Sequence, residues 1–103
     1  MNSLELIQQE RKEQIEKHGR TLDHDIKYNA DKEMGKAASM LAVPEVPEFF
    51  ITFPPKGWDK EVWKKMISKP YKQRLIIAGA LILAELDRLA VKITNKAAKD
   101  DKV

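Results

Sequence analysis

Hydrophobic positions recur at helical spacings along most of the chain, but the amino-terminal segment departs from that pattern. Asn2 or Ser3 can cap a first helix, and with Asn2 as the cap, Glu5 completes a capping-box-like pair. Gly19 supplies the stop, which leaves a helix of about four turns. The middle turn of this helix, Gln8 to Gln14, contains no hydrophobic residue. Its inward side must therefore be polar.

Two later segments do carry an apolar helical face. The first runs from about Ala30 to Ala42, and the second is capped by Asp59 and ends near Ser68. The apolar positions of the two segments recur three or four residues apart: they are Met34, Ala37, Ala38 and Leu41, and then Val62, Trp63, Met66 and Ile67. Both segments are predicted to pack against a common core.

The last predicted helix organises the fold. It runs from Pro70 to about Ile93, and proline is tolerated at a helix start because its missing N–H is not needed there. Every residue from Leu75 to Leu86 except Glu85 is apolar or glycine, so this helix is hydrophobic on all sides. The apolar run is too short for a membrane span of roughly 17 to 25 residues. We expect a central helix, part of whose surface packs on a second copy of the chain, which makes a homo-oligomer.

The segments between the helices are rich in residues that favour turns. Residues 19–29 are predicted to form a loop with one helical turn. The four prolines of the Pro-rich loop 43–58 exclude regular helix there. Within this loop the run from Phe49 to Phe53 is compatible with a strand, but it is too short for a sheet of its own. A polar, lysine-rich tail follows over residues 94–103.

These patterns predict an all-α protein, a small helical bundle of about three to four helices around a central C-terminal hydrophobic helix. At 103 residues, of which 43% are hydrophobic, residues 1–103 are expected to form one domain. The absence of cysteine excludes disulfides and thiolate metal sites, so a metal would need Asp, Glu or His. The amino-terminus lacks the layout of a signal peptide, and we expect a cytoplasmic protein.

A basic stretch surrounds the predicted short helix. Its lysines are at positions 56, 60, 64, 65, 69 and 72, and the net charge of the whole chain is +3. Asp59 and Glu61 interrupt the stretch, and no motif typical of a nucleic-acid-reading helix is present. Nucleic-acid binding is therefore not favoured, and a solvated helix face explains the lysines equally well.

Acidic residues on three predicted helices are candidates for a metal site. Glu10 and Glu13 lie on adjoining turns of the first helix, Glu33 lies near the start of the second, and Asp87 lies among apolar residues of the last. Carboxylates that face the interior of a bundle can hold magnesium, which orients phosphates. We expect Glu10, Glu33 and Asp87 to bind Mg²⁺. Glu10 and Glu13 are the catalytic candidates, one acting as general base toward a water that attacks a phosphoanhydride.

Each of these residues also has a structural interpretation. Glu13 is typical of a solvated helix face, and the acids of the last helix can form ion pairs with Arg88. The dipeptide His24-Asp25 can cap a loop, and Trp58 can anchor a core or an interface.

The order of polar and small residues along the chain resembles a group of short proteins common in phage and prophage genomes. The resemblance covers most of residues 5 to 90. It is carried by Glu10-Arg11 with Gln14, then Gly19, His24-Asp25, Asp31 with Glu33, Ala37-Ala38, and the segment from Ala78 to Leu89.

The helix and acid layout of that group is similar to the MazG-type all-α nucleoside triphosphate pyrophosphohydrolases. Glu10-Arg11-Lys12-Glu13 fits the Glu-x-x-Glu element of their motif, whereas the later Glu-x-x-Asp element has no counterpart. The resemblance implies a magnesium-dependent enzyme that acts on nucleotides.

A second, non-catalytic interpretation stays open. In it the chain is an oligomeric helical protein that binds a small anionic ligand or a protein, and, as the resemblance to phage proteins implies, sequesters a nucleotide signal in the cytoplasm of the host cell. In that case the cationic residues would hold phosphate through charge-assisted hydrogen bonds; they are Arg11, His24, Arg74 and Arg88. Trp58 or a phenylalanine would stack on a base. The full set of predicted ligand-binding residues is Arg11, Gln14, His24, Asp25, Trp58, Arg74 and Arg88.

Overall fold

Every regular element in the described part of the chain is a helix. The computed structural model describes the backbone of residues 1–101 and the side chains of residues 1–91. The helices are α1 (Ser3–His18), α2 (Leu22–Tyr28), α3 (Glu33–Leu41), α4 (Glu48–Thr52), α5 (Lys60–Ile67) and α6 (Tyr71–Asp101). The predicted all-α fold is confirmed.

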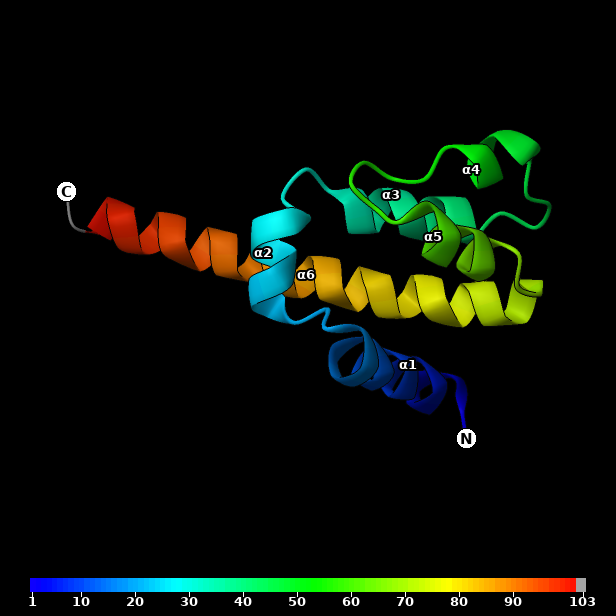
Figure 1. Ribbon diagram of the computed structural model, residues 1–103. Coiled ribbons are helices and arrows are strands. Elements are labelled where there is room, and N and C mark those ends of the chain that lie inside the picture. Colours follow the sequence, from blue (N-terminus) through cyan, green and yellow to red (C-terminus); the bar gives the residue numbers. More distant parts are fainter. Residues whose placement is uncertain (102–103) are drawn as a thin grey trace.

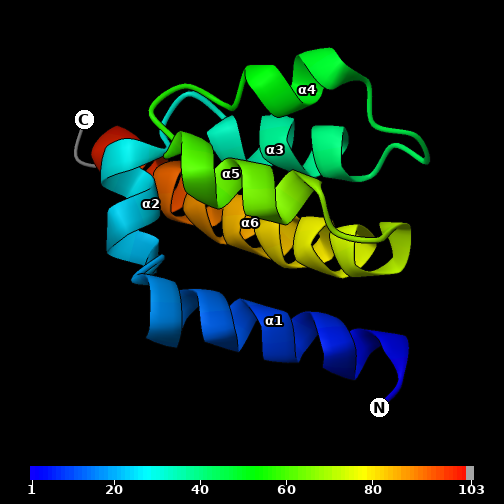
Figure 2. The ribbon, with the colours of Figure 1, turned by 45° about the vertical axis from the view of Figure 1, so that its right-hand side comes forward.

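The long helix α6 lies at the centre of the bundle (Figure 1). Figures 1 and 2 show α1 along one side of α6, and α3 and α5 along the other. The buried core joins α3, α5 and α6, and small residues of α3 and α6 allow these two helices to approach closely. Its members are Met34, Ala37, Ala38, Leu41, Trp63, Ile67, Ile77, Ala78, Leu81 and Ala84. The predicted central role of the C-terminal helix is therefore correct.

Helix α1 begins and ends as its sequence predicts. The Asn2 side chain accepts a hydrogen bond from the Glu5 N–H at 2.9 Å, and the Glu5 carboxylate accepts one from the Asn2 N–H. Gly19 ends the helix in the left-handed conformation, with φ 64°. The inward side is polar, because Arg11 and Gln14 are the buried residues of this helix.

Two segments form more helix than the sequence predicts. The stretch after Gly19 forms α2, because Thr21 caps it by accepting a hydrogen bond from the His24 N–H at 3.2 Å. The predicted exclusion of helix from the Pro-rich loop is also wrong, since Glu48–Thr52 forms α4. The prolines flank this turn rather than interrupt it, and Pro47 takes the N-cap position. The carbonyl of Phe50 then accepts a hydrogen bond from the Trp63 indole at 2.7 Å.

Two helix boundaries also differ from the prediction. Helix α3 begins at Glu33 rather than near Ala30, because Lys32 takes a left-handed conformation with φ 69° that a helix cannot contain. Helix α6 continues through most of the predicted polar tail to Asp101. The last two positions of that tail, 102–103, lie outside the described residues.

One side of α6 remains uncovered. Leu75, Ile82 and Leu86 lie along one stripe of the helix and are 41%, 49% and 57% exposed. This α6 stripe lies on the face of the helix opposite the buried Ile77. Although α6 is apolar, none of the helices in the described part of the chain has the length and hydropathy needed to cross a bilayer.

Candidate functional site

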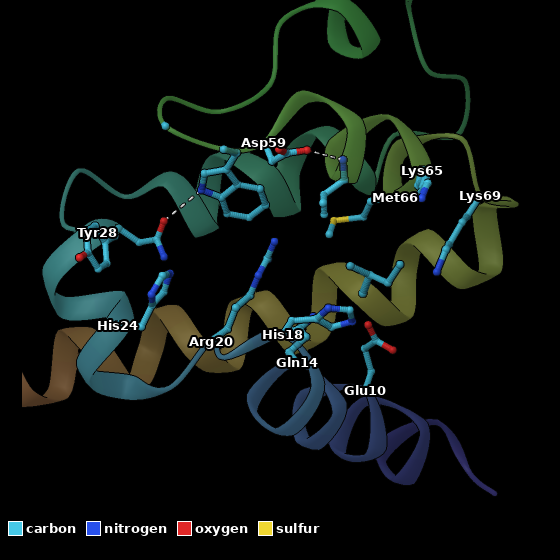
Figure 3. A pocket seen from close by; sticks show the side chains of 15 residues that line it. Glu10, Gln14, His18, Arg20, His24, Tyr28, Asp59, Lys65, Met66 and Lys69 are labelled. Carbon is cyan, nitrogen blue, oxygen red and sulfur yellow. Dashed lines mark hydrogen bonds between the residues drawn. The ribbon is translucent and has the colours of Figure 1, made fainter.

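A pocket of about 620 Å³ opens between α1 and α2 on one side and α5 on the other (Figure 3). Ile77 of α6 contributes to its inner wall. The remaining lining residues come from these three helices and from the segments that flank α2 and α5. They are Glu10, Gln14, His18, Arg20, His24, Tyr28, Asn29, Gly57, Trp58, Asp59, Val62, Lys65, Met66 and Lys69.

Helix α1 supplies one polar wall of the pocket. Glu10, Gln14 and His18 are four residues apart and therefore lie on one face of the helix. Gln14 is only 3% exposed. The polar middle turn that the sequence shows is thus explained by a pocket, not by a packed core.

Arg20 enters the pocket because the chain turns at Gly19. Its backbone N–H donates to the Gln14 carbonyl at 3.0 Å, and its own carbonyl accepts from the Arg11 guanidinium at 3.0 Å. With its backbone held in this way, the guanidinium lies over the Trp58 ring, 4.4 Å from the ring centroid. Its buried Nη1 atom has no hydrogen-bond partner among the described residues.

A chain of polar contacts fixes Trp58. Its indole N–H donates to the side-chain oxygen of Asn29 at 3.0 Å, and the side-chain NH₂ of Asn29 donates to Asp25 at 2.9 Å. Arg11 approaches the other oxygen of Asp25 at 3.8 Å. The Trp58 ring also packs edge-on against the buried Trp63, with centroids 5.8 Å apart. The aromatic surface of the pocket is therefore held rigidly.

Burial shifts the pKa values of two charged groups around the pocket. Burial lowers the pKa of Arg20, and Arg11 adds to this, while the charges of Asp25 and Glu10 act in the opposite direction. Burial raises the pKa of Asp25, and the hydrogen bond from Asn29 and the charges of Arg11, His24 and Arg20 oppose the rise. An oppositely charged partner, or loss of the charge, would stabilise each of these buried groups.

Cationic side chains predominate in the pocket. Lys65 of α5 and Lys69, which follows the end of α5, join Arg20, with His18 and His24 nearby. Of the two acids, Asp59 already accepts a hydrogen bond from the Val62 N–H at 2.9 Å as the cap of α5. Glu10 is the remaining carboxylate. The arrangement favours an anionic ligand.

Four of the predicted site residues line this pocket. Glu10 and Gln14 come from α1, His24 from α2 and Trp58 from the loop before α5. Asp25 lies behind the wall, fully buried, and positions Asn29. Arg11 holds the Arg20 carbonyl and faces Asp25. These two residues support the pocket without lining it.

The other two predicted phosphate-binding arginines have structural roles. Arg74 donates hydrogen bonds to the carbonyls of Leu41, Val43 and Pro44, at 2.8, 2.6 and 3.2 Å. Arg88 forms a buried ion pair with Glu85. Both guanidinium groups are used to close the fold, because buried charges and helix-end carbonyls need partners.

The predicted metal ligands are not brought together. Glu33 accepts a hydrogen bond from the Asp31 N–H at 2.9 Å, Asp87 is exposed, and Glu10 lines the pocket. Glu13, the second catalytic candidate, faces Lys17 at 3.9 Å outside the pocket. No group of three or more His, Asp or Glu side chains suited to a metal occurs in the part of the chain that the structure describes. Within one chain, these carboxylates do not fit a magnesium site.

Several lining residues are not among those predicted from the sequence. His18 continues the spacing of Glu10 and Gln14, so the helical period alone indicates it. Lys65 and Lys69 belong to the basic stretch that a solvated helix face also explains. Arg20 follows a helix stop, and only the folded turn at Gly19 directs it inward.

Comparison with known proteins adds no relative from which a role can be transferred. No family model, no curated protein and no solved structure matches the chain. The geometry of the pocket is therefore the basis for a functional assignment.

Proposed function

We propose that this protein binds a nucleotide in the pocket between α1, α2 and α5 and does not catalyse its conversion. The observation that carries this proposal is the Arg20 guanidinium, which lies over the Trp58 ring and whose buried Nη1 atom has no hydrogen-bond partner among the described residues. A guanidinium plane can stack on a base, and its N–H groups can donate to phosphate oxygens.

The size and charge of the pocket support the same ligand class. Its volume of about 620 Å³ falls within the range of about 300–1,000 Å³ that is usual for small-molecule sites. Lys65 and Lys69 lie on the opposite wall from α1, so a bound nucleotide would have cations for its phosphates and a planar surface for its base.

The arrangement of acids favours binding over hydrolysis. A pyrophosphohydrolase of the MazG type needs clustered carboxylates that hold magnesium. In this chain Glu33 and Glu85 are engaged in other contacts, and Glu10 is the carboxylate that the pocket can offer to a ligand. We therefore propose that ligand binding does not require magnesium.

The resemblance to short phage proteins gives this binding a biological setting. We propose that the protein sequesters a nucleotide signal in the cytoplasm of a host cell. A protein with this role would hold its ligand and return it unchanged.

A thermal-shift and calorimetry screen tests the proposal. The panel contains nucleoside monophosphates, triphosphates and cyclic nucleotides, each with magnesium or with EDTA. At least one nucleotide should raise Tm equally in both conditions, and chromatography should recover it intact. Arg20→Met should abolish the shift, whereas Lys17→Met, an exposed change on α1, should not. No shift with any nucleotide, or magnesium-dependent release of pyrophosphate, would overturn the proposal.

We propose also that the α6 stripe pairs with a second copy of the chain. The stripe is apolar and exposed, and it runs beside Gly79, where Ile7 of α1 packs on α6. In an antiparallel pair Leu75 of one copy lies opposite Leu86 of the other, so the surface is complementary to itself, as a two-fold dimer requires. The pocket lies on the other side of α6 and stays open in such a dimer.

A further inference from the structure

Gln14 is the least satisfied polar side chain of the pocket. It is 3% exposed, and neither its amide nitrogen nor its amide oxygen has a hydrogen-bond partner among the described residues. Asn29, the other buried amide in the lining, has both groups paired, one with Asp25 and one with Trp58. Figure 3 shows Gln14 beside His18 on the α1 side of the pocket, below Arg20.

Such an amide is unfavourable without a partner. A buried donor and acceptor that have lost water without gaining partners destabilise the fold, whereas leucine of similar size would pack there without this penalty. The Gln14 backbone is also tied to the ligand site, because its carbonyl accepts the Arg20 N–H at 3.0 Å. The Gln14 main chain is therefore fixed directly beside Arg20, the proposed stacking residue.

The chemistry of the amide points to a base as its partner. A carboxamide offers one donor and one acceptor side by side, and it pairs with a planar ring that presents an acceptor and a donor on neighbouring atoms. The adenine edge formed by N7 and the N6 amino group has this pattern, and glutamine binds it in a bidentate manner. A phosphate group offers acceptors alone and would leave the Gln14 oxygen unpaired.

We propose that Gln14 reads the base of the bound nucleotide and selects adenine. This inference rests on the proposed function. Arg20 stacks on the base, Lys65 and Lys69 face the phosphates, and Gln14 makes the base-specific pair.

Two substitutions at position 14 test the proposal by base selectivity. Gln14→Leu removes both hydrogen-bonding groups at similar volume, and we expect about a tenfold to hundredfold loss of affinity for AMP or ATP with an equal or higher Tm. Gln14→Glu offers acceptors alone, which suit the neighbouring N–H groups of guanine. We expect it to shift the preference from adenine to guanine nucleotides. Gln9→Leu, the same change at an exposed position of α1, should alter neither property.

The outcomes separate this inference from the function on which it rests. Calorimetry with AMP, GMP, CMP and UMP on the full chain and the three variants gives both affinity and selectivity. Equal affinity of the wild type for all four bases, or unchanged adenine affinity in Gln14→Leu, overturns the role of Gln14 and leaves nucleotide binding intact. A wild-type chain that binds none of the four, nor their triphosphates or cyclic forms, overturns both proposals.

Discussion

Ile7 of α1 and Gly79 of α6 pack so closely that a Cβ atom at position 79 would lie 2.8 Å from the Ile7 Cδ1 atom. The glycine allows the amino-terminal helix to dock on the central one. Since α1 carries Glu10, Gln14 and His18, this contact also sets one wall of the pocket.

A pair of glycine substitutions measures the contact. Ala is favoured over Gly inside a helix by about 1 kcal/mol. At Gly35 the added Cβ would meet only the Glu85 carboxylate, at an ordinary 3.7 Å, so Gly35→Ala should stabilise the fold. Gly79→Ala should show no such gain, because Ile7 must move. Urea unfolding followed by circular dichroism gives both values, and equal stabilisation at the two sites would contradict the prediction.

Arg74 closes the end of α3, and its loss should be costly. Arg74→Met leaves the carbonyls of Leu41, Val43 and Pro44 without these donors, and we expect destabilisation by roughly 3 kcal/mol. Lys72→Met, an exposed change on the same helix, is the matched control and should change stability by less than about 0.5 kcal/mol. Under conditions in which both variants are fully folded, neither should bind the ligand more weakly than the wild type. A similar stability of the two variants would disprove the role of Arg74.

Asp25 should make stability depend on pH. Because burial raises its pKa, the native state keeps a proton at pH values where the unfolded state has lost it, so unfolding releases a proton. Stability from this group therefore falls as pH rises above the ordinary aspartate pKa of about 3.9.

The substitution Asp25→Asn removes this titration. Its free energy of unfolding relative to wild type should increase steadily as pH rises from about 4 toward the raised pKa of Asp25. Urea titrations of both proteins at several pH values test this. A difference in the free energy of unfolding that stays constant or shrinks as pH rises would contradict the prediction.

The α6 stripe predicts self-association. The wild-type chain should have the mass of a dimer by light scattering at micromolar concentration. The double variant Ile82→Lys and Leu86→Lys should be monomeric, because it places charges in the centre of an apolar contact. Gln73→Lys, an exposed change on another side of α6, should remain dimeric. A monomeric wild type would rule out the proposed pairing.

Local sequence determined the helix ends and the polar character of α1. Asn2 with Glu5, Gly19, and Asp59 act through side chains and backbone conformations within a few residues of themselves, so their effect can be predicted without the fold. The same holds for the central place of α6, because a helix that is apolar on all sides has to be covered.

Tertiary structure decided which charged residues face the ligand pocket. Arg20 and Arg74 are chemically alike in the sequence, yet one stacks on Trp58 and the other binds the carbonyls at the end of α3. That division depends on where distant backbone groups lie, and residue spacing carries no information about it. The short helix α4 is similar, since a five-residue turn gains its stability from packing on α5 rather than from its own propensity.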